Sequence, residues 1–385
     1  MARFRSTIRS GLLYAPPLRR LVDQRDELQG TVESLVALVE QRDATIAEER
    51  GQLAQARRDR DELRARASGL TDRIRELERA LLDLRRRAPD RPHQTVFQGF
   101  WHGPPLDVVL RACLQSFIEQ GHAFHLYVYE PVDVPDGVVL MDANEVIPFE
   151  EIFYYRDPTT GRKDLGPFSD LFRFRLLDMR GGWWVDVDTV CLSSHIPQAD
   201  SAWAREFPEY SPAALGTSSI ALSEGSDLAK TLYEECLALS RAGYEAREAL
   251  GPDLLSRVIG ERGLPSDNFG NTVRFYPIRW IEAFKLWLPQ FCDEVSTKAG
   301  AAQFLALWQS VARYQGIDLS KAPPTGSYLD QVCERFGTAN GDGLRQDAAT
   351  SLSNVRHFFV ENDWAADALR AVAGGEGTLL MLGVN

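Results

Sequence analysis

The sequence predicts an α/β domain that is preceded by a long α-helical coiled coil. Strand-like and helix-like segments alternate after residue 94, whereas a heptad pattern of apolar residues runs through the residues before it. With 385 residues, 44% of them hydrophobic, the chain is long enough to bury a substantial core. We expect four parts: a basic N-terminal segment at 1–18, a coiled coil at 19–88, the α/β domain at 94–340 and a helix–strand segment at 341–385.

Residues 19–87 contain no proline and are rich in Arg, Glu, Asp, Leu and Ala, which is typical of a long solvated helix. Apolar residues recur every seven positions: one heptad position holds Leu28, Leu35, Ala56, Leu63, Leu70, Leu77 and Leu84, and the other holds Val32, Val39, Ile46, Leu53, Ala67, Ile74 and Leu81. The 3.5-residue period predicts a left-handed coiled coil, and β-branched residues at several a positions favour a parallel homodimer through residues 19–88. The alternatives are a lone solvated helix, or a hairpin that folds back at Gly30, Gly51 or Gly69.

The α/β domain is predicted from a strand, helix, strand order at its start. Residues 95–101 are typical of a strand, 105–122 of an amphipathic helix closed by Gly121, and 123–130 of a second strand. This order predicts two parallel strands joined by a right-handed crossover. Further on we expect helices at 226–240 and from Pro252, a strand at 272–277 and a loop at 322–327. The last residues are interpreted as helix then strand, which either complete the sheet or begin a further unit.

Charge and cysteine content exclude several classes of function. A net charge of −12 argues against a nucleic-acid partner, so a phosphorylated ligand would need a local cation. The five cysteines are scattered and include no CxxC pair, which indicates neither a disulfide framework nor a zinc cluster. No apolar run is long enough for a transmembrane segment, and the basic start lacks the apolar core of a signal peptide. We expect a cytoplasmic protein whose basic start is either an exposed terminus or a peripheral contact with the inner face of the membrane.

The stretch "FSDLFRFRLLDMRGGWWVDVDTVCL" at 168–192 carries the candidate chemistry. Ser169 is a favourable N-cap for a helix over 170–180, which the glycine pair at 181–182 would end. If the following residues form one strand, Asp186 and Asp188 lie on the same face. Two carboxylates on an apolar strand are costly to bury without a cation, and oxygen ligands suit Mn²⁺ or Mg²⁺.

Spacing alone does not identify a site, because the same D-x-D pattern occurs at Asp59 and Asp61 on the predicted coiled coil. Asp170 and Arg173 are adjacent on one helical face. They either belong to the site or form an ordinary pair near a helix N-terminus, where an acidic residue is favoured.

The combined pattern is S-D-L-F-R at 169–173 followed by G-G-W-W-V-D-V-D at 181–188. It resembles the glycosyltransferases with a DXD sugar-binding region: family 32, its capsular-polysaccharide relatives and the glucosyltransferase domains of large clostridial toxins. "FQGFWHGPPL" is similar to that family's first strand, and "GPDLLSRVI" to its G-P-x-L-L-x-R helix. The resemblance covers roughly residues 94–335.

This resemblance implies a GT-A fold, a Rossmann-like α/β domain that binds a nucleotide-sugar at the carboxyl ends of its strands. It implies that Trp101 stacks on the base, that Asp170 and Arg173 hold the donor sugar, and that Asp186 bridges ribose and metal while Asp188 ligates the metal. The residues expected at the nucleotide-sugar site are Trp101, His102, Gly103, Ser169, Asp170, Arg173 and Asp186. Those expected in catalysis are Asp170, Arg173, Asp186 and Asp188. His102 is as well explained as a loop histidine.

The implied activity is a metal-dependent, retaining transfer from a UDP- or GDP-sugar to a glycan or lipid-linked acceptor, as in surface polysaccharide synthesis. Mn²⁺ or Mg²⁺ would neutralise the leaving nucleoside diphosphate. A metal-dependent phosphohydrolase would normally need more acidic or histidine ligands than this region offers.

The sequence departs from the family pattern in two places. Residues 306–309 read A-L-W-Q where relatives carry an H-L-W-N-like motif, and Arg279 stands where histidine is expected. Arg279 either pairs with the diphosphate or is a surface charge. The alternative function is therefore a catalytically impaired relative that acts as a coiled-coil scaffold or interaction protein.

Aromatic residues near the predicted site have two interpretations each. Phe149, Phe153, Tyr154 and Tyr155 line an acceptor site or pack in the core. Trp280, Trp287 and Trp308 close over the donor or are core residues.

Overall fold

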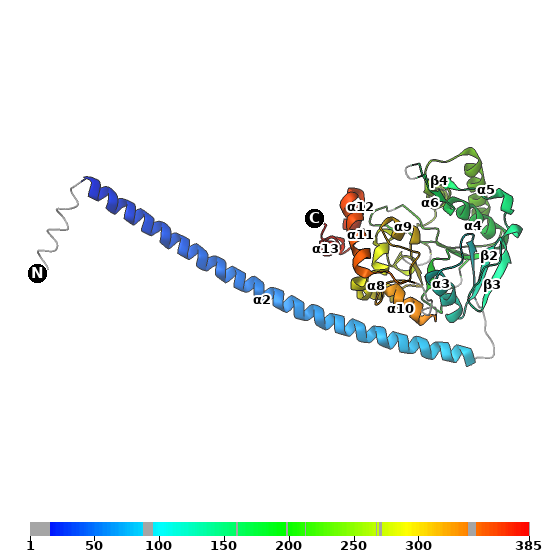
Figure 1. Ribbon diagram of the computed structural model, residues 1–385, viewed down its shortest axis with the longest axis horizontal. Helices are drawn as coiled ribbons and strands as arrows, with labels where there is room; N and C mark the ends of the chain where they lie inside the picture. Colours follow the sequence, from blue (N-terminus) through cyan, green and yellow to red (C-terminus); the bar gives the residue numbers. More distant parts are fainter. Residues whose placement is uncertain are drawn as a thin grey trace, which may run out of the picture. The chain divides into compact units, whose positions relative to one another are not determined.

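The computed structural model describes residues 16–87, 95–158, 161–197, 199–211, 213–266, 268, 272–337 and 344–384 (Figure 1). The chain divides near residue 75 into two units, a long N-terminal helix and a mixed α/β body, each of which is described by itself. Most of the expected basic segment at 1–18 and the predicted boundary at 88–94 lie outside the described residues. No helix in the described ranges is long and apolar enough to cross a bilayer.

The N-terminal helix α2 runs without a break from Pro16 to Arg87, 72 residues in all. At 1.5 Å per residue it is about 110 Å long. The hairpin alternative is therefore wrong, because the helix continues through all three of its glycines. Four heptad residues, Leu28, Val32, Leu35 and Val39, are each more than half exposed in the single chain. A dimer that would bury them remains a prediction.

Within the described residues the body contains a six-stranded sheet with the order β3-β2-β1-β6-β9-β8. Its strands are β1 (Val96–Trp101), β2 (Ala123–Val128), β3 (Val138–Asp142), β6 (Gly182–Val185), β8 (Ser201–Ala202) and β9 (Ser219–Leu222). β3, β2, β1 and β6 run parallel, β9 is antiparallel to β6, and β8 is antiparallel to β9. The predicted strand–helix–strand start is confirmed: α3 (Val108–Glu119) connects β1 to β2 and is capped by the Asp107 carboxylate.

Helices cover both faces of this sheet (Figure 1). The face that includes Trp184 packs against α4 (Gly166–Arg180), α5 (Asp227–Ala242) and α6 (Pro252–Glu261). The opposite face, which includes Trp183, packs against α3. The neighbouring tryptophans thus point to opposite layers, as alternation along a strand requires. The predicted helices at 226–240 and from Pro252 are confirmed as α5, with Ser226 as its N-cap, and α6.

The rest of the body is built from short elements. Two small antiparallel sheets pair β4 (Tyr155–Arg156) with β5 (Lys163–Asp164) and β7 (Thr189–Cys191) with β10 (Phe304–Ala306). The remaining helices that the structure describes before residue 340 are α7 (Thr272–Phe275), α8 (Cys292–Ala299), α9 (Gln309–Tyr314) and α10 (Tyr328–Arg335). The 3₁₀ helices among the described residues are η1 (Ala143–Glu145), η2 (Phe149–Glu151), η3 (Arg247–Leu250), η4 (Trp280–Leu286) and η5 (Pro289–Phe291).

The strand predicted at 272–277 is wrong, because this segment forms α7. The Tyr276 N–H donates to the Thr272 carbonyl over 2.6 Å, which closes a helical turn. Phe275 and Tyr276 are fully buried against the Trp183 face of the sheet. Burial of these rings therefore overrides the strand propensity of the segment.

The strand predicted at the C-terminus is also wrong. Residues 344–384 form three helices, α11 (Ala348–Glu361), α12 (Asp363–Ala371) and α13 (Gly375–Leu382). In α13, Leu379 and Leu382 are buried whereas Leu380 and Met381 are exposed, a spacing that fits a helix. The segment neither extends the sheet nor begins a separate unit, because Phe359 packs in one core with Phe284 of η4.

Candidate active site

The helix α4 begins earlier than predicted. It starts at Gly166 with Pro167 in its first turn, where the missing N–H of proline costs no hydrogen bond. Ser169 is therefore inside the helix, its N–H donating to the Leu165 carbonyl over 2.9 Å, and its assignment as N-cap is wrong. The Asp164 carboxylate accepts from the Gly166 N–H over 2.7 Å instead.

The predicted end of α4 at the glycine pair is confirmed. Gly181 has a φ of +59°, and a Cβ atom there would lie 2.3 Å from the Glu224 backbone nitrogen. Only glycine fits both the conformation and the space. The Gly181 carbonyl accepts from the Gln98 side chain over 2.8 Å, which joins the end of α4 to β1.

The single strand predicted through residues 183–192 is interrupted. β6 ends at Val185, and the Thr189 N–H donates to the Asp186 carbonyl over 3.0 Å, which closes a turn before β7. Asp186 and Asp188 therefore do not share a strand face. They lie past the carboxyl end of β6, where open α/β sheets bind ligands. The alternating pattern continues through this turn and so conceals it.

Arg173 joins Asp170 and Asp186 into one buried ionic network. Its guanidinium pairs with Asp170 Oδ1 and, over 2.6 Å, with Asp186 Oδ1, and its carbon Cζ lies 5.0 Å from the centroid of the Trp184 ring. The Trp184 indole N–H also donates to Asp186 Oδ1, over 2.8 Å. Burial opposes the charge on Arg173, but the two carboxylates outweigh it and raise its pKa. Arg173 therefore stays positive and fixes both carboxylates.

Asp170 sits where only a glycine backbone leaves room for it. Burial raises its pKa to about 6, although the Arg173 charge acts in the opposite direction. A Cβ atom on Gly251 would lie 2.4 Å from Asp170 Oδ2. The hydroxyl of Thr217 is 3.5 Å from Asp170 Oδ1 on another side. The carboxylate is thus held between α4, the residue before α6, and the segment leading to β9.

Asp188 lies beside Asp186 without a basic partner. Burial, and then the charge of Asp186, raise its pKa to about 6. Within the described ranges no basic side chain forms an ion pair with Asp188. A bound cation would offset both causes of the shift, and two carboxylates suit Mn²⁺ or Mg²⁺. In the described part of the chain, no group of three or more His, Cys, Asp or Glu side chains could hold a metal ion.

Residues 306–309, the A-L-W-Q segment, lie directly against Asp188. The Leu307 N–H donates to the Asp188 carbonyl over 2.9 Å, and the Gln309 N–H donates to Asp188 Oδ2 over 3.1 Å. Trp308 has a φ of +52° and is the sole non-glycine residue with positive φ in the described ranges. Its ring is fixed by a 3.0 Å hydrogen bond to the Ile278 carbonyl. The segment therefore contacts the predicted metal ligand through its backbone.

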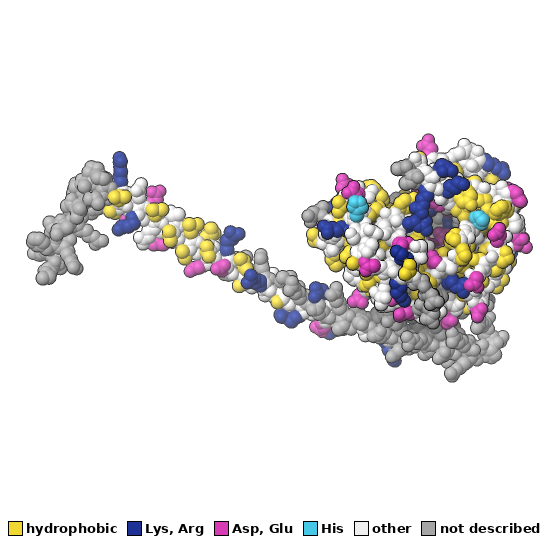
Figure 2. Space-filling view, in the orientation of Figure 1, with side chains coloured by type: hydrophobic (Ala, Val, Ile, Leu, Met, Phe, Trp, Pro, Cys, Tyr) yellow, Lys and Arg dark blue, Asp and Glu magenta, His cyan; other side chains and the backbone are white. Residues whose placement is uncertain are grey.

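Two adjoining cavities collect most of the predicted residues. The first, about 680 Å³, is lined by Ser169, Asp170, Arg173, Asp186 and Asp188 among others. The second, also about 680 Å³, is lined by His102 and Gly103 and by several basic side chains. The residues common to both cavities are Arg247, Glu248, Ser310 and Tyr314. Figure 2 shows basic side chains gathered around a hollow in the body.

Trp101 and His102 are close to the second cavity but differ in their surroundings. The Trp101 indole N–H donates to the Pro104 carbonyl over 3.0 Å, and Gly103 lies against its ring. Trp101 is not among the residues that line either cavity. The His102 ring contacts the edges of Tyr129 and Phe149, each with 5.8 Å between ring centroids.

Sequence patterns missed several titratable residues of the first cavity, among them Arg247 and Glu206. Arg247 pairs with Asp164, whose carboxylate outweighs the effect of burial and raises the pKa of Arg247. Burial, together with nearby Glu248, raises the pKa of Glu206 to about 8, so this carboxyl group is mostly protonated at neutral pH. Neither residue lies in a motif, and tertiary folding alone brings them to the site.

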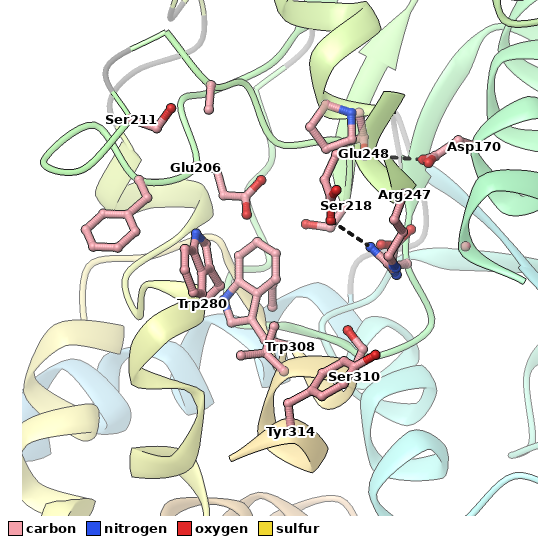
Figure 3. A pocket seen from close by; sticks show the side chains of 18 of the residues that line it. Asp170, Glu206, Ser211, Ser218, Arg247, Glu248, Trp280, Trp308, Ser310 and Tyr314 are labelled. Carbon is pink, nitrogen blue, oxygen red and sulfur yellow. Dashed lines mark hydrogen bonds and ion pairs between the residues drawn. The ribbon is translucent and has the colours of Figure 1, made fainter. Parts of the chain in front are cut away.

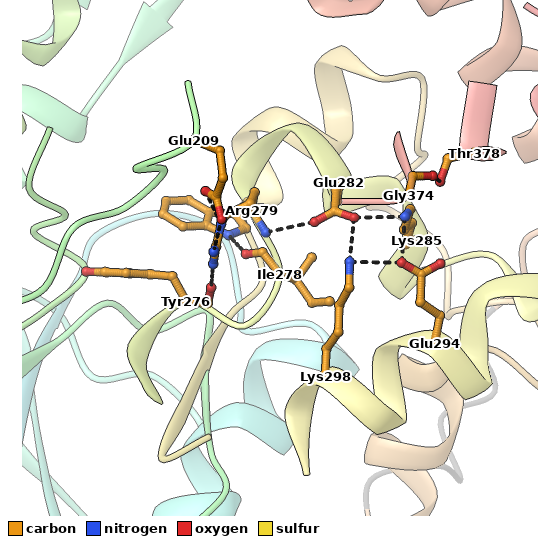
Figure 4. Close-up of polar contacts among 11 residues, drawn as sticks. Glu209, Tyr276, Ile278, Arg279, Glu282, Lys285, Glu294, Lys298, Gly374 and Thr378 are labelled. Atoms are coloured by element: carbon orange, nitrogen blue, oxygen red, sulfur yellow. Dashed lines mark hydrogen bonds and ion pairs between the residues drawn. The ribbon is translucent and has the colours of Figure 1, made fainter. Parts of the chain in front are cut away.

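The structure also places the residues whose roles the sequence left open. Arg279 is buried and makes two hydrogen bonds, of 2.9 and 2.6 Å, to Glu209, so it is not a surface charge (Figure 4). Close to it, the fully buried Lys285 pairs with Glu282 and Glu294. Among the aromatic residues, Trp287 and Phe153 pack in or on the core. Trp280 and Trp308 line the first cavity and Tyr154 and Tyr155 the second, whereas Phe149 is 45% exposed.

Comparisons with known proteins identify no family for this chain. No protein-family model matches it, and no curated protein matches its sequence. A solved structure described as "PaToxG Glycosyltransferase" is similar over 51% of this chain and 79% of its own, with 11% sequence identity and a TM-score of 0.33. A similarity this low does not establish a shared fold, so the function is argued from the site alone.

Proposed function

We propose that the α/β body is a metal-dependent, retaining glycosyltransferase of the GT-A type that uses a UDP- or GDP-sugar and transfers the sugar to a glycan or lipid-linked acceptor. The observation that carries this proposal is the clustering of Asp170, Arg173, Asp186 and Asp188 in one cavity past the carboxyl end of β6. A nucleotide-sugar needs a cationic group for its diphosphate and hydrogen-bonding groups for its sugar hydroxyls. With a cation bound at Asp186 and Asp188, this cluster would offer both.

Asp186 and Asp188 would hold Mn²⁺ or Mg²⁺. The bound ion would neutralise the negative charge that develops on the nucleoside diphosphate as it leaves. Arg173 keeps Asp186 in place through its 2.6 Å contact, which fixes one ligand before the donor arrives. The Gln309 N–H does the same for Asp188 over 3.1 Å. Preorganised ligands lower the reorganisation cost of the reaction.

Asp170 would accept hydrogen bonds from hydroxyl groups of the donor sugar. Its pKa of about 6 leaves it mainly ionised at neutral pH, and Arg173 fixes its orientation. Trp101, His102 and Gly103, at the carboxyl end of β1, would contact the nucleotide, and His102 and Gly103 open onto the adjoining cavity. The nucleotide would then extend from that cavity to the aspartates, past the residues that line both cavities.

A donor panel tests this function. The full chain is incubated with Mn²⁺ and UDP- or GDP-sugars, and donor hydrolysis and the shift in Tm are measured. We expect at least one donor, in the presence of Mn²⁺, to raise Tm and to be hydrolysed. Asp188→Asn should abolish both the Tm shift and the hydrolysis. Asp59→Asn is the matched control, because Asp59 belongs to the D-x-D of the exposed helix α2. No hydrolysis and no shift with any donor would contradict the proposal.

Retention has its own test in the stereochemistry of the first product. Proton NMR of the released or transferred sugar, recorded before mutarotation, should show the anomeric configuration of the donor. An inverted anomer would leave the glycosyltransferase activity standing and refute retention.

The second candidate is a scaffold or interaction protein whose α/β body has lost activity. The exposed heptad leucines and valines of α2 and the absence of a ligating side chain at Ala306 favour it. It predicts donor binding without turnover, unchanged by Asp188→Asn. The donor panel therefore separates the two functions.

A further inference from the structure

One wall of the first cavity is aromatic and comes from separate parts of the chain. Phe207, Trp280, Trp308, Phe358 and Trp364 contribute to it, the last two from α11 and α12. Figure 3 shows Trp280, Trp308 and Tyr314 on one side of the cavity and Asp170 and Arg247 on the other. The C-terminal helices thus complete a cavity whose opposite wall carries the proposed donor residues.

The rings of this wall pack against one another, and part of the Trp364 surface remains exposed to solvent. The centroids of Trp280 and Trp364 are 6.2 Å apart with 35° between the ring planes, and Phe358 meets Trp364 edge-on at 6.1 Å. Phe207 contacts Trp280 edge-on at 5.7 Å. Trp364 is nevertheless 51% exposed, whereas Trp287 of the same half of the body is 1% exposed. An exposed, supported indole is a feature of binding surfaces rather than of cores.

The junction between α11 and α12 presents these residues to the cavity. Asn362, with non-helical backbone angles, separates the two helices, and its side-chain N–H donates to the Phe358 carbonyl over 2.7 Å. This hydrogen bond ties Asn362 to the last turn of α11, and Trp364 follows two residues later in the first turn of α12. Phe358, Asn362 and Trp364 all line the cavity.

Polar groups stand among the rings. Glu206, Ser211 and Asn362 line the same cavity. An acyl chain lying on the rings would leave these groups without partners, which is costly where water is excluded. A pyranose ring matches the whole lining, because its C–H face carries partial positive charge suited to the negative face of an indole, while its hydroxyl groups bond to the polar side chains.

We propose that the C-terminal helices α11 and α12 build the acceptor subsite, and that the acceptor is a carbohydrate whose pyranose ring stacks on Trp364 and Trp280. This inference rests on the proposed function, since it takes the opposite wall as the donor site. The same sugar ring occurs in free glycans and in lipid-linked glycans, so the subsite would bind the sugar ring of either kind of acceptor.

The first experiment measures binding and does not depend on turnover. Saturation-transfer NMR of the full-length protein is recorded with a panel of free oligosaccharides and with a matched series of alkyl glycosides of increasing chain length. We expect saturation of sugar C–H protons for at least one oligosaccharide, and loss of most of that signal in Trp364→Ala. Trp364→Phe should retain part of it. The matched control is Leu380→Ala, which removes an apolar side chain on α13 that is 65% exposed, against 51% for Trp364.

The second experiment separates acceptor from donor. With a donor that is hydrolysed, Trp364→Ala should raise the acceptor KM about tenfold or more and the donor KM far less, whereas Leu380→Ala should leave both KM values and the rate of donor hydrolysis within about twofold of the wild type. No oligosaccharide signal in the wild type, a signal equal in Trp364→Ala, or binding that follows alkyl chain length rather than the sugar would overturn the inference. If the wild type neither binds nor hydrolyses any donor, the proposed function is refuted instead. The NMR result would still decide whether the subsite binds carbohydrate.

Discussion

The backbone N–H of Gln309 donates a hydrogen bond of 3.1 Å to Oδ2 of Asp188. The carboxylate is thereby oriented by the main chain of the A-L-W-Q segment at 306–309. Since the contact uses the main chain, it does not depend on which side chains stand at positions 306 and 309.

Gly251→Ala should disable the site while leaving the fold largely intact. The new Cβ atom would lie 2.4 Å from Asp170 Oδ2 and would push the carboxylate out of line with Arg173. Displacements of about 1 Å at a reacting centre cost on the order of 100-fold in rate, so we expect a loss of that order in donor hydrolysis. Gly260→Ala, inside the helix α6 that follows Gly251 and with nothing within 4 Å, is the control and should raise stability by up to about 1 kcal/mol. Equal activities of the two variants would refute the role of this close approach.

Arg173→Lys should lower both stability and activity. A lysine ammonium has no planar fork, so it cannot hold Asp170 and Asp186 in the geometry that Arg173 imposes. Because the network is buried, we expect a loss of roughly 3 kcal/mol in the free energy of unfolding, measured in urea. Arg175→Lys, at a more exposed pair with Asp178, should change it by less than about 1 kcal/mol. A similar small loss at Arg173 would show that the network contributes little.

Glu206→Gln should become more stable than the wild type as pH rises. The pKa of Glu206 is raised in the folded protein to about 8 from its ordinary value of 4.5, first by burial and then by Glu248, against the effect of Arg247. Its contribution to stability is therefore complete below about pH 4.5 and is lost as pH rises through about 8. Partial exposure reduces the full linkage value, so we expect the variant to lead by roughly 2 kcal/mol at pH 9 and by little at pH 5.

The measurement is urea unfolding across pH 5 to about 9 in the presence of a chelator, with exposed Glu224→Gln as the control. Parallel pH profiles for wild type and Glu206→Gln would mean that Glu206 titrates normally.

Helix α2 should form a parallel dimer through its heptad positions. Leu35 is 55% exposed in the single chain, and its burial against a partner would stabilise the dimer. Sedimentation equilibrium should give twice the chain mass for the wild type, and Leu35→Asp should shift it towards one chain mass. Glu33→Asp, outside the two apolar heptad positions, should not. A wild-type chain that sediments as a monomer at micromolar concentration would contradict the dimer.

The sequence predicted correctly those helix ends that are determined by a capping residue or by a glycine in the sequence itself. Ser226 caps α5, and Gly181 ends α4 where a positive φ and close approach require glycine. The turn after Val185 was missed because it depends on a tertiary contact, the Asp186 N–H to the Ser218 carbonyl, and alternation of V-D-V-D hides it. Likewise, the apolar run in α13 shows no period until the packing of Leu379 and Leu382 is known.

The candidate site divides in the same way. Asp170, Arg173, Asp186 and Asp188 are close in sequence and form a pattern that indicates their role. Glu206, Arg247 and Trp364 reach the cavity from distant segments, and each is an ordinary residue in its local context. A single sequence therefore reveals the half of the site that one helix–turn–strand unit supplies, and the fold supplies the other half.

The turn between β6 and β7 has a mechanical consequence. Asp186 stands at the end of the six-stranded sheet, whereas Asp188 stands at the start of the strand that pairs with β10. A cation held by both carboxylates would cross-link the two sheets in addition to the short turn that already joins β6 to β7. Addition of Mn²⁺ should then slow amide hydrogen exchange along β7 and β10, so the exchange rate of these strands would show whether the metal site is occupied.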